Sequence, residues 1–393
     1  MRGLNSGADV RATLAAVEAL GVRVAYDDNY QVQVYGEGMG GLREPGGPID
    51  AGNSGTTVRT MLGVAAAIEG LTVFIGDRSL SERPMLRVVA PLRQMGARID
   101  GRANGELLPL VVRGGALRGV DIELSVASAQ VKTALLFAGC LATGTTSVIE
   151  PGPSRDHTER MLSAAGVAVV RSGTTVSVDG PQLPAPLNVR VPGDMSSAAF
   201  LIVAALLVEG SDLTIEDVGI NPTRTGLIDA LRAMGADIEV IETGTEGGEP
   251  VGSIRVRSSA LVGASPDPAA VPTFIDEIPV LAIAATQAEG ETTIRGASEL
   301  RVKETDRISA LVEGITAIGG RAEAHPDGMT VTGSTPLRGA DVDSLGDHRV
   351  AMAFAVAGLV ADDNIRIAKW SCVDTSFPEF LDVLGRAQGR LTA

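Results

Sequence analysis

Two kinds of segment alternate along the chain, and this alternation limits the possible folds more than any other feature of the sequence. The first kind, here called the B half, has apolar residues three and four positions apart and then a glycine. This pattern predicts an amphipathic helix that ends at a positive-φ glycine and leads into a short strand. The B halves cover residues 13–26, 88–100, 161–170, 228–240, 311–324 and 380–387.

The second kind, the A half, predicts an Ala-rich helix, a glycine turn and a strand rich in Thr, Ile and Val. The A halves cover residues 54–74, 128–149, 196–215, 276–294 and 347–367. Because these helices are apolar on every face, we expect them to be buried all round, unlike the B-half helices. An A half followed by a B half forms one repeating unit, and the alternation of helices and strands predicts an α/β fold.

The glycines that close the B halves are regularly spaced. They are Gly21, Gly96, Gly166, Gly235, Gly319 and Gly385, at intervals of 75, 70, 69, 84 and 66 residues. This period exceeds that of a solenoid repeat, so we expect compact domains that each contain several units. A chain of 393 residues is also too long for one ordinary core, which favours two domains.

The repeat contains six B halves and five A halves, because the first B half has no A half before it. We therefore expect that the first half-unit is missing from the chain as given. The alternative is that the first unit is built without its A half.

The chain is acidic, with a formal net charge of −15, which argues against binding to nucleic acid or to an anionic membrane surface. Its two cysteines, Cys140 and Cys372, offer neither a disulfide framework nor a metal-ligand spacing. The first residues lack the apolar region of a signal peptide, and the apolar stretch 198–208 is too short to cross a bilayer. We expect a soluble cytoplasmic protein.

Polar loops lead into the A-half helices, at residues 52–57, 125–130, 192–197, 274–277 and 345–349. Free N–H groups and partial positive charge make helix N-termini natural anion sites. Equivalent helix starts in a repeat tend to face the same way, so we expect the starts near residues 54, 128, 196, 276 and 347 to face one cleft. Cationic residues in or after the loops support an anion-binding cleft: Arg59, Arg83, Arg155, Arg160, Lys303, Arg307 and Arg349.

Several candidates also have an ordinary structural interpretation. Asp276 and Asp347 could be helix N-caps, and His348 could be a structural histidine. Lys303 and Arg307 are four residues apart, which predicts that they share a helix face. The sequence contains no Walker A motif, dinucleotide-binding glycine pattern or metal-ligand cluster, so we expect neither a metal nor a cofactor.

Ten motifs follow one another from residue 52 to residue 380. They read GNSGTTVR (52–59), SERPM (81–85), VASAQVKTALL (126–136), EPGPSRDHTERML (150–162), VPGDMSSAAF (191–200), NPTRTG (221–226), IDEIPVLA (275–282), ELRVKETDRI (299–308), GDHRVAMAF (346–354) and TSFPEF (375–380). In these motifs the chain resembles the 5-enolpyruvylshikimate-3-phosphate synthase family of enolpyruvyl transferases. A relative that acts on UDP-N-acetylglucosamine would need a cysteine in the loop 76–84, which contains none.

The resemblance implies two similar domains, each built from three βαβαββ units, an architecture like an inverse α/β barrel. The domains would cover residues 1–190 and 191–393, with the first half-unit missing. Members of the family begin with a Gly-x-Lys-Ser segment and an Arg that contact both substrates, and no equivalent is found here. The alternative function is therefore a binding protein for shikimate 3-phosphate that performs no chemistry.

The reaction implied by the resemblance transfers the enolpyruvyl group of phosphoenolpyruvate to the 5-hydroxyl of shikimate 3-phosphate and releases phosphate. It needs no cofactor and no metal. The implied partners are these two small molecules, without nucleic acid or membrane, and we expect a monomer.

The resemblance also assigns residues to the two substrates. Those implied for phosphoenolpyruvate are Gly55, Arg83, Gln130, Arg307 and Arg349. Those implied for shikimate 3-phosphate are Ser128, Ala129, Gln130, Ser154, Asp276 and Lys303. Two positions depart from some relatives, since Ala129 replaces a serine and Thr375 replaces a lysine.

The reaction needs a base for the hydroxyl proton and an acid for the methylene carbon, and two carboxylates held among cations suit this need. We assign Asp276 as the base and Glu304 as the group that protonates the methylene. His348 would support the orientation of these groups.

Overall fold

The computed structural model describes residues 1–26 and 31–389. The chain divides into two compact units, of which unit 1 contains Met1–Val191 and Glu246–Glu249. Unit 2 contains Pro192–Thr245 and Pro250–Ala393. Four residues at the tip of a hairpin of unit 2 thus belong to unit 1, a feature that the repeat does not indicate.

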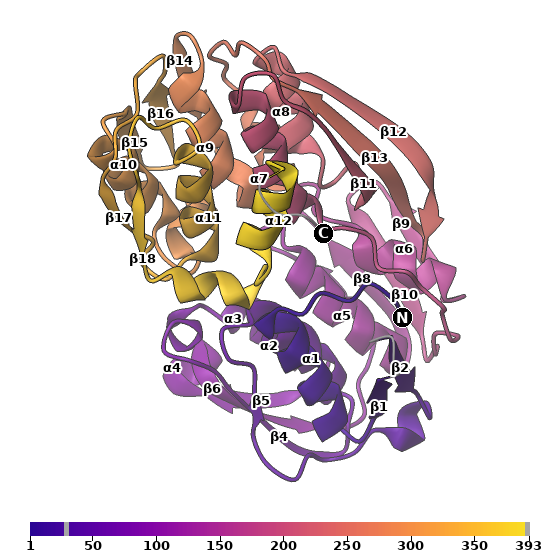
Figure 1. Ribbon diagram of the computed structural model, residues 1–393. Coiled ribbons are helices and arrows are strands. Elements are labelled where there is room, and N and C mark those ends of the chain that lie inside the picture. The colour runs from indigo at the N-terminus through magenta and orange to yellow at the C-terminus, as the bar shows by residue number, and fades with distance from the viewer. Residues whose placement is uncertain (27–30, 390–393) are drawn as a thin grey trace. The chain divides into compact units, whose positions relative to one another are not determined.

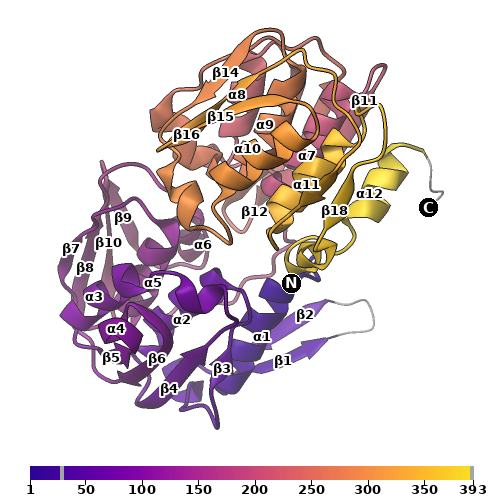
Figure 2. The ribbon, with the colours of Figure 1, turned by 90° about the vertical axis from the view of Figure 1, so that its left-hand side faces the viewer.

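Unit 1 contains two four-stranded sheets with the same topology (Figures 1 and 2). The first repeat is β3 (Ile49–Asp50), α2 (Gly55–Ala65), β4 (Gly70–Ile75), α3 (Leu86–Gln94), β5 (Arg98–Gly101) and β6 (Leu107–Gly114). The second is β7 (Asp121–Glu123), α5 (Ala129–Leu141), β8 (Gly144–Ile149), α6 (His157–Ala164), β9 (Val169–Ser172) and β10 (Thr175–Gly180). The strand orders are β3-β4-β6-β5 and β7-β8-β10-β9, each with one parallel pair, β3 with β4 and β7 with β8. Both repeats are therefore βαβαββ units.

The remaining elements of unit 1 are α1 (Ala8–Ala19), β1 (Arg23–Tyr26), β2 (Val32–Tyr35), the short helix α4 (Arg102–Gly105) and the 3-10 turns η1 (Met39–Gly41) and η2 (Leu80–Glu82). Strands β1 and β2 form an antiparallel pair. Helix α1 starts five residues before the first predicted B half, 13–26. Strand β1 forms the end of that B half, as predicted.

Unit 2 follows a similar order of elements, although in the described chain its first two repeats have no named strand before the first helix and its third repeat ends at α12. Its first repeat is α7 (Met195–Leu207), β11 (Asp212–Gly219), α8 (Gly226–Ala233), β12 (Asp237–Glu246) and β13 (Glu249–Arg257). The second is α9 (Ile278–Gln287), β14 (Glu291–Ile294), α10 (Arg307–Ala317), β15 (Arg321–His325) and β16 (Gly328–Thr332). The third is β17 (Asp341–Asp343), α11 (His348–Ala357), β18 (Arg366–Ala368) and α12 (Phe380–Ala387). The 3-10 turns of this unit are η3 (Pro268–Thr273), η4 (Ile275–Glu277), η5 (Ser298–Val302) and η6 (Trp370–Thr375).

The A-half helices form the core of each unit, as their composition predicts. In unit 2, α7, α9 and α11 lie side by side with the strands outside them (Figures 1 and 2), and every residue from Ile278 to Thr286 is buried. In unit 1, α2 and α5 approach so closely that a Cβ at Gly63 would lie 2.0 Å from the carbonyl oxygen of Ala134. Small residues thus allow these helices to pack backbone to backbone.

The predicted glycine caps are confirmed for five of the six B halves, because Gly21, Gly96, Gly166, Gly235 and Gly319 all have positive φ. The sixth prediction is wrong. Gly385 lies inside α12, and Gly389 has positive φ (67°) two residues after that helix ends. Gly389 is 70 residues after Gly319, an interval closer to most of the others than the predicted 66.

Among the described residues, none of the helices combines the length and the hydropathy that a membrane-spanning segment needs.

Candidate active site

The parallel strand pairs determine where the polar loops lie. Strands β3 and β4 are parallel neighbours, so the loops that follow their carboxyl ends meet at one edge of the sheet. These loops lead to the start of α2 and to Arg83. The same relation between β7 and β8 brings the start of α5 and the loop that contains Ser154 to one edge.

A first polar cluster surrounds the N-terminus of α2 in unit 1. Ser54 is the N-cap, and its hydroxyl accepts a hydrogen bond from the Thr57 amide at 3.2 Å. Arg59, one turn into the helix, donates from Nη1 to Oε1 of Gln130 at 2.7 Å. Gln130 in turn donates to the Thr56 hydroxyl at 2.8 Å. Two hydrogen bonds through Gln130 therefore join the first turns of α2 and α5.

Gly55, the first residue of α2, lies directly beside two arginine side chains of this cluster. A Cβ at this position would lie 2.8 Å from Nη1 of Arg59 and 3.5 Å from Nη1 of Arg83. Arg83 is itself buried and donates from Nη2 to Oδ1 of Asn53 at 2.6 Å. Two guanidinium groups thus lie beside the start of α2, where a helix has free N–H groups, which makes this position suitable for an anion.

Two serines lie at the other edge of unit 1. Ser128 is the N-cap residue of α5, but its side chain makes no capping hydrogen bond, and Ala129 is the first residue of the helix. Ser154 is 8% exposed, and its hydroxyl has no hydrogen-bond partner within the described residues. A buried hydroxyl of this kind is costly unless a ligand or water completes it.

A second cluster, in unit 2, is centred on Arg307, the first residue of α10. Its Nε donates to Oδ2 of Asp347 at 2.7 Å, its Nη1 to Oδ1 of Asp276 at 3.3 Å and its Nη2 to Oε2 of Glu304 at 2.5 Å. Lys303 Nζ lies 3.2 Å from the same Oδ1 of Asp276. One buried guanidinium therefore fixes three carboxylates.

Arg349 joins this cluster through the start of α9. Its Nη1 donates to the backbone oxygen of Asp276 at 3.0 Å and lies 3.6 Å from Oε1 of Glu277. The Glu277 carboxylate also accepts a hydrogen bond from Ser196 and lies 3.8 Å from Nη2 of Arg224. The starts of α7, α9 and α11 thus meet within unit 2.

The electrostatic surroundings of the unit 2 cluster decide which of its side chains are charged at pH 7. Burial, and to a lesser extent the charge of Arg349, lower the pKa of His348 to about 4, so its imidazole is neutral at pH 7. Burial alone would lower the pKa of Arg307, but Asp347, Glu304 and Asp276 raise it above its usual value. Arg307 therefore remains a cation.

The structure decides two open interpretations, those of Asp347 and Asp276, and tests one prediction. Asp347 is an N-cap, because Oδ1 accepts from the amides of Arg349 and Val350, and its Oδ2 also binds Arg307. Asp276 is not the cap of α9, because it lies in η4 and the N-cap is Glu277. The predicted shared helix face of Lys303 and Arg307 is wrong, since α10 begins only at Arg307. The two side chains nevertheless both reach Asp276.

Four charged residues of the clusters were not among the assigned site residues: Arg59, Arg224, Glu277 and Asp347. A signal for Arg59 was present, because it is one of the cationic residues that come directly after the polar loops, two residues beyond the loop 52–57. Glu277 stands beside Asp276 in the sequence, but only the packing of α7 against α9 brings Ser196 to it. That all five helix starts face one cleft stays a prediction.

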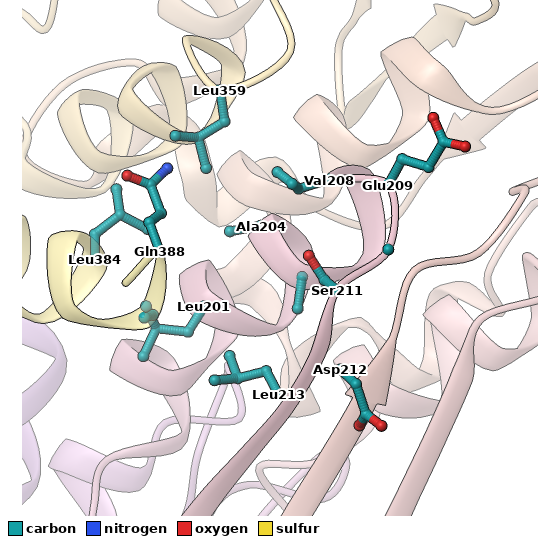
Figure 3. A pocket seen from close by; sticks show the side chains of 13 residues that line it. Leu201, Ala204, Val208, Glu209, Ser211, Asp212, Leu213, Leu359, Leu384 and Gln388 are labelled. Atoms are coloured by element: carbon teal, nitrogen blue, oxygen red, sulfur yellow. The ribbon is translucent and has the colours of Figure 1, made fainter. Parts of the chain in front are cut away.

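A separate cavity of about 350 Å³ lies in unit 2, at the opposite end of α7 from Ser196. Its walls include Leu201, Leu213, Leu359 and Leu384, with Glu209 nearby (Figure 3). It contains none of the residues of the polar clusters, so the chemistry does not belong there.

Cys140 is not part of either cluster. Cys140 lies near the end of α5, where burial raises the pKa of its thiol to about 11, so it is not a nucleophile at neutral pH. Within residues 1–26 and 31–389, no three His, Cys, Asp or Glu side chains are arranged to hold a metal ion.

Comparison with known proteins adds an independent line of evidence. The family model described as EPSP synthase (3-phosphoshikimate 1-carboxyvinyltransferase) matches residues 1–384. The 3-phosphoshikimate 1-carboxyvinyltransferase of Brevibacillus brevis is 49% identical over 98% of this chain and 90% of its own length. That of Gloeobacter violaceus is 51% identical over 99% of this chain and 90% of its own length.

Solved structures agree with these matches. An EPSP synthase from Acinetobacter baumannii superposes with a TM-score of 0.87 at 43% identity, over 98% of this chain and 89% of that one. The enolpyruvyl transferase NikO from Streptomyces tendae gives a TM-score of 0.73 at 18% identity, over 96% and 86%, which shows a common fold.

Proposed function

The chain belongs to the EPSP synthase (3-phosphoshikimate 1-carboxyvinyltransferase) family, and we infer that it transfers the enolpyruvyl group of phosphoenolpyruvate to the 5-hydroxyl of shikimate 3-phosphate. The reaction releases phosphate and belongs to the shikimate pathway of aromatic amino-acid biosynthesis. The match to the family over residues 1–384 carries this conclusion. No observation favours the alternative of a binding protein without chemistry.

For phosphoenolpyruvate, we propose Gly55, Arg83 and Gln130 in unit 1 and Arg307 and Arg349 in unit 2. Phosphoenolpyruvate carries a phosphate and a carboxylate, and guanidinium groups bind both through paired N–H donors. The two guanidinium groups over the start of α2 support this assignment in unit 1.

For shikimate 3-phosphate, we propose Ser128, Ala129, Gln130 and Ser154 in unit 1 and Asp276 and Lys303 in unit 2. The buried Ser154 hydroxyl supports a hydrogen bond to the phosphate, since it lacks a partner in the described chain. Lys303, which lies 3.2 Å from Asp276, supplies a cation beside the group that would meet the 5-hydroxyl.

In the addition step, we assign Asp276 as the base that takes the proton from the 5-hydroxyl as its oxygen bonds to C2 of phosphoenolpyruvate. Glu304 delivers a proton to C3, which becomes a methyl group. In the elimination step Glu304 takes a proton back from C3, the C2–O bond to phosphate breaks, and the proton held by Asp276 leaves with the phosphate.

The arrangement on Arg307 suits these roles. Lys303 and Arg307 both contact Oδ1 of Asp276, and such cations favour the ionised form that a base needs. Glu304 contacts the other side of the same guanidinium, which also favours its ionised form, so the negative charge of bound phosphoenolpyruvate must offset that cation for Glu304 to carry a proton. His348, neutral at pH 7, acts as an orienting group rather than as an acid.

The test is an omission experiment with product identification. Phosphate release is measured with both substrates and with each one alone, and the organic product is identified by mass spectrometry. Release only with both substrates, together with a product of the mass of 5-enolpyruvylshikimate 3-phosphate, supports the proposal. Binding of shikimate 3-phosphate without any turnover would support the silent binding protein instead.

We also propose that the protein is a cytoplasmic monomer. Sedimentation of the purified chain tests the oligomeric state.

A further inference from the structure

A buried ionic triad in unit 1 lies outside the residues used so far. Lys132 on α5 is fully buried, and its Nζ lies 2.8 Å from Oε2 of Glu150 and 2.7 Å from Oε1 of Glu159. The two carboxylates are also almost fully buried, with side-chain exposures of 3% and 8%. One ammonium group therefore holds two carboxylates away from water.

Such a triad constrains geometry more strongly than a surface ion pair does. Removing charges from water is costly, and the cost is offset only where the partners stay in close contact. Because two carboxylates share one ammonium, displacement of Lys132 would leave like charges facing each other in the interior. The three side chains therefore resist any change in their separation.

The triad joins segments that all carry proposed contacts to shikimate 3-phosphate. Glu150 directly follows β8, and Glu159 lies in the first turn of α6. The short loop between them, residues 151–156, contains Ser154. Lys132 itself lies in the first turn of α5, the helix whose start contains Ser128 and Gln130. Both ends of the Ser154 loop are thus fixed to one atom of α5.

A hydrogen bond forms a second link between α5 and α6, in addition to the triad. The hydroxyls of Thr133 on α5 and Thr158 on α6 lie 2.5 Å apart. The Ser154 hydroxyl, which lies between the two fixed ends, is buried and without a partner in the described chain. The surroundings therefore hold in place a hydroxyl whose hydrogen bonding only a ligand or a water could satisfy.

We propose that Lys132, together with Glu150 and Glu159, is a positioning residue for shikimate 3-phosphate. It fixes the distance between Ser154 and the start of α5, so that both can contact the same substrate phosphate. The proposal rests on the proposed function, because it assumes that Ser154 meets this substrate. It predicts that the triad acts on one substrate and not on the other.

The first experiment uses a variant in which the whole triad is neutral: Lys132→Met, Glu150→Gln and Glu159→Gln. This variant leaves no unpaired buried charge, so it is expected to fold. The KM for shikimate 3-phosphate should rise about tenfold or more, as expected for a misplaced contact, whereas the KM for phosphoenolpyruvate should change by less than about twofold. Titration calorimetry of shikimate 3-phosphate alone should show the same loss of affinity.

A single variant and a control complete the test. Glu159→Gln keeps the Lys132–Glu150 pair, so it is expected to fold even if the triple variant does not, and to weaken shikimate 3-phosphate binding several-fold. Arg93→Met is the matched structural control, because Arg93 holds the backbone oxygens of Ile99 and Asn104 elsewhere in unit 1. It should lower the melting temperature and leave both KM values unchanged.

Folded triad variants whose two KM values are unchanged, or rise equally, would overturn the proposal. Wild-type protein and Ser154→Ala distinguish this failure from a failure of the proposed function. If the wild type binds shikimate 3-phosphate and Ser154→Ala weakens it, a normal affinity in the triad variants refutes only the positioning role. If the wild type does not bind shikimate 3-phosphate, the proposed function and this inference both fail.

Discussion

Nε of Arg307 donates a hydrogen bond to Oδ2 of Asp347 at 2.7 Å, and both side chains are essentially inaccessible to solvent. The other carboxylate oxygen of Asp347 caps α11, so the central cation of the unit 2 cluster is anchored to a helix start. The remaining nitrogens of Arg307 are then directed towards Asp276 and Glu304. The stability of α11 and the geometry of the proposed catalytic carboxylates therefore depend on one aspartate.

Asp347→Asn should lower the free energy of unfolding by about 1–3 kcal/mol, because it replaces a buried charge-assisted hydrogen bond with a weaker one. Asp347→Ala should cost about 1 kcal/mol more, because it also removes the cap of α11. Chemical denaturation measures both. The control is Asp341→Asn, in an exposed pair with Arg366, which should change stability by less than about 0.5 kcal/mol. Equal effects of Asp347→Asn and Asp341→Asn would contradict the anchoring role.

His348 should make stability depend on pH. Its pKa is about 4 in the folded protein and 6.5 ordinarily, so between these values the unfolded chain binds a proton that the folded protein does not. The folded state therefore loses stability as the pH falls from 6.5 to 4, by up to about 3 kcal/mol, and no more below that range. Unfolding of wild type and His348→Gln, compared at several pH values, should show a shallower slope in the variant. Identical slopes would be inconsistent with a buried neutral histidine.

Arg349→Met and Arg83→Met should each weaken phosphoenolpyruvate binding by about 2–5 kcal/mol, since each removes a guanidinium partner of a desolvated anion. Titration calorimetry in the presence of shikimate 3-phosphate gives the affinities. Arg366→Met, which removes an exposed arginine, is the control. Wild-type affinity in either of the first two variants would remove that arginine from the proposed site.

The repeat and its buried helices could be predicted from the sequence because they depend on local periodicity and on composition. The Ala-rich part of the A half 276–294, for instance, is apolar on every face, which indicates a helix buried in the core, and α9 is such a helix. Gly385 misled the prediction because a glycine near the end of an apolar pattern looks like a cap. The helix in fact continues through it to Ala387.

Most residues of the candidate site could also be predicted from the sequence, but the contacts between their side chains could not. Lys303, Arg307 and Asp276 were recognisable from motifs, whereas the contact of Arg307 with three carboxylates depends on how α9, α10 and α11 pack. The buried triad of Lys132 is a further case. A lysine inside an Ala-rich helix gives no sign of its partners, because Glu150 and Glu159 follow it by 18 and 27 residues.

The central claim is that Asp276 and Glu304, held together on Arg307, perform the proton transfers of enolpyruvyl transfer. The most direct test is the steady-state rate of phosphate release by wild type, Asp276→Asn and Glu304→Gln with both substrates at saturation. We predict turnover by the wild type, and a kcat lowered about 10²–10⁴-fold in each variant, with melting temperatures that show folded protein. Phosphate release at the wild-type rate by either variant would contradict the account.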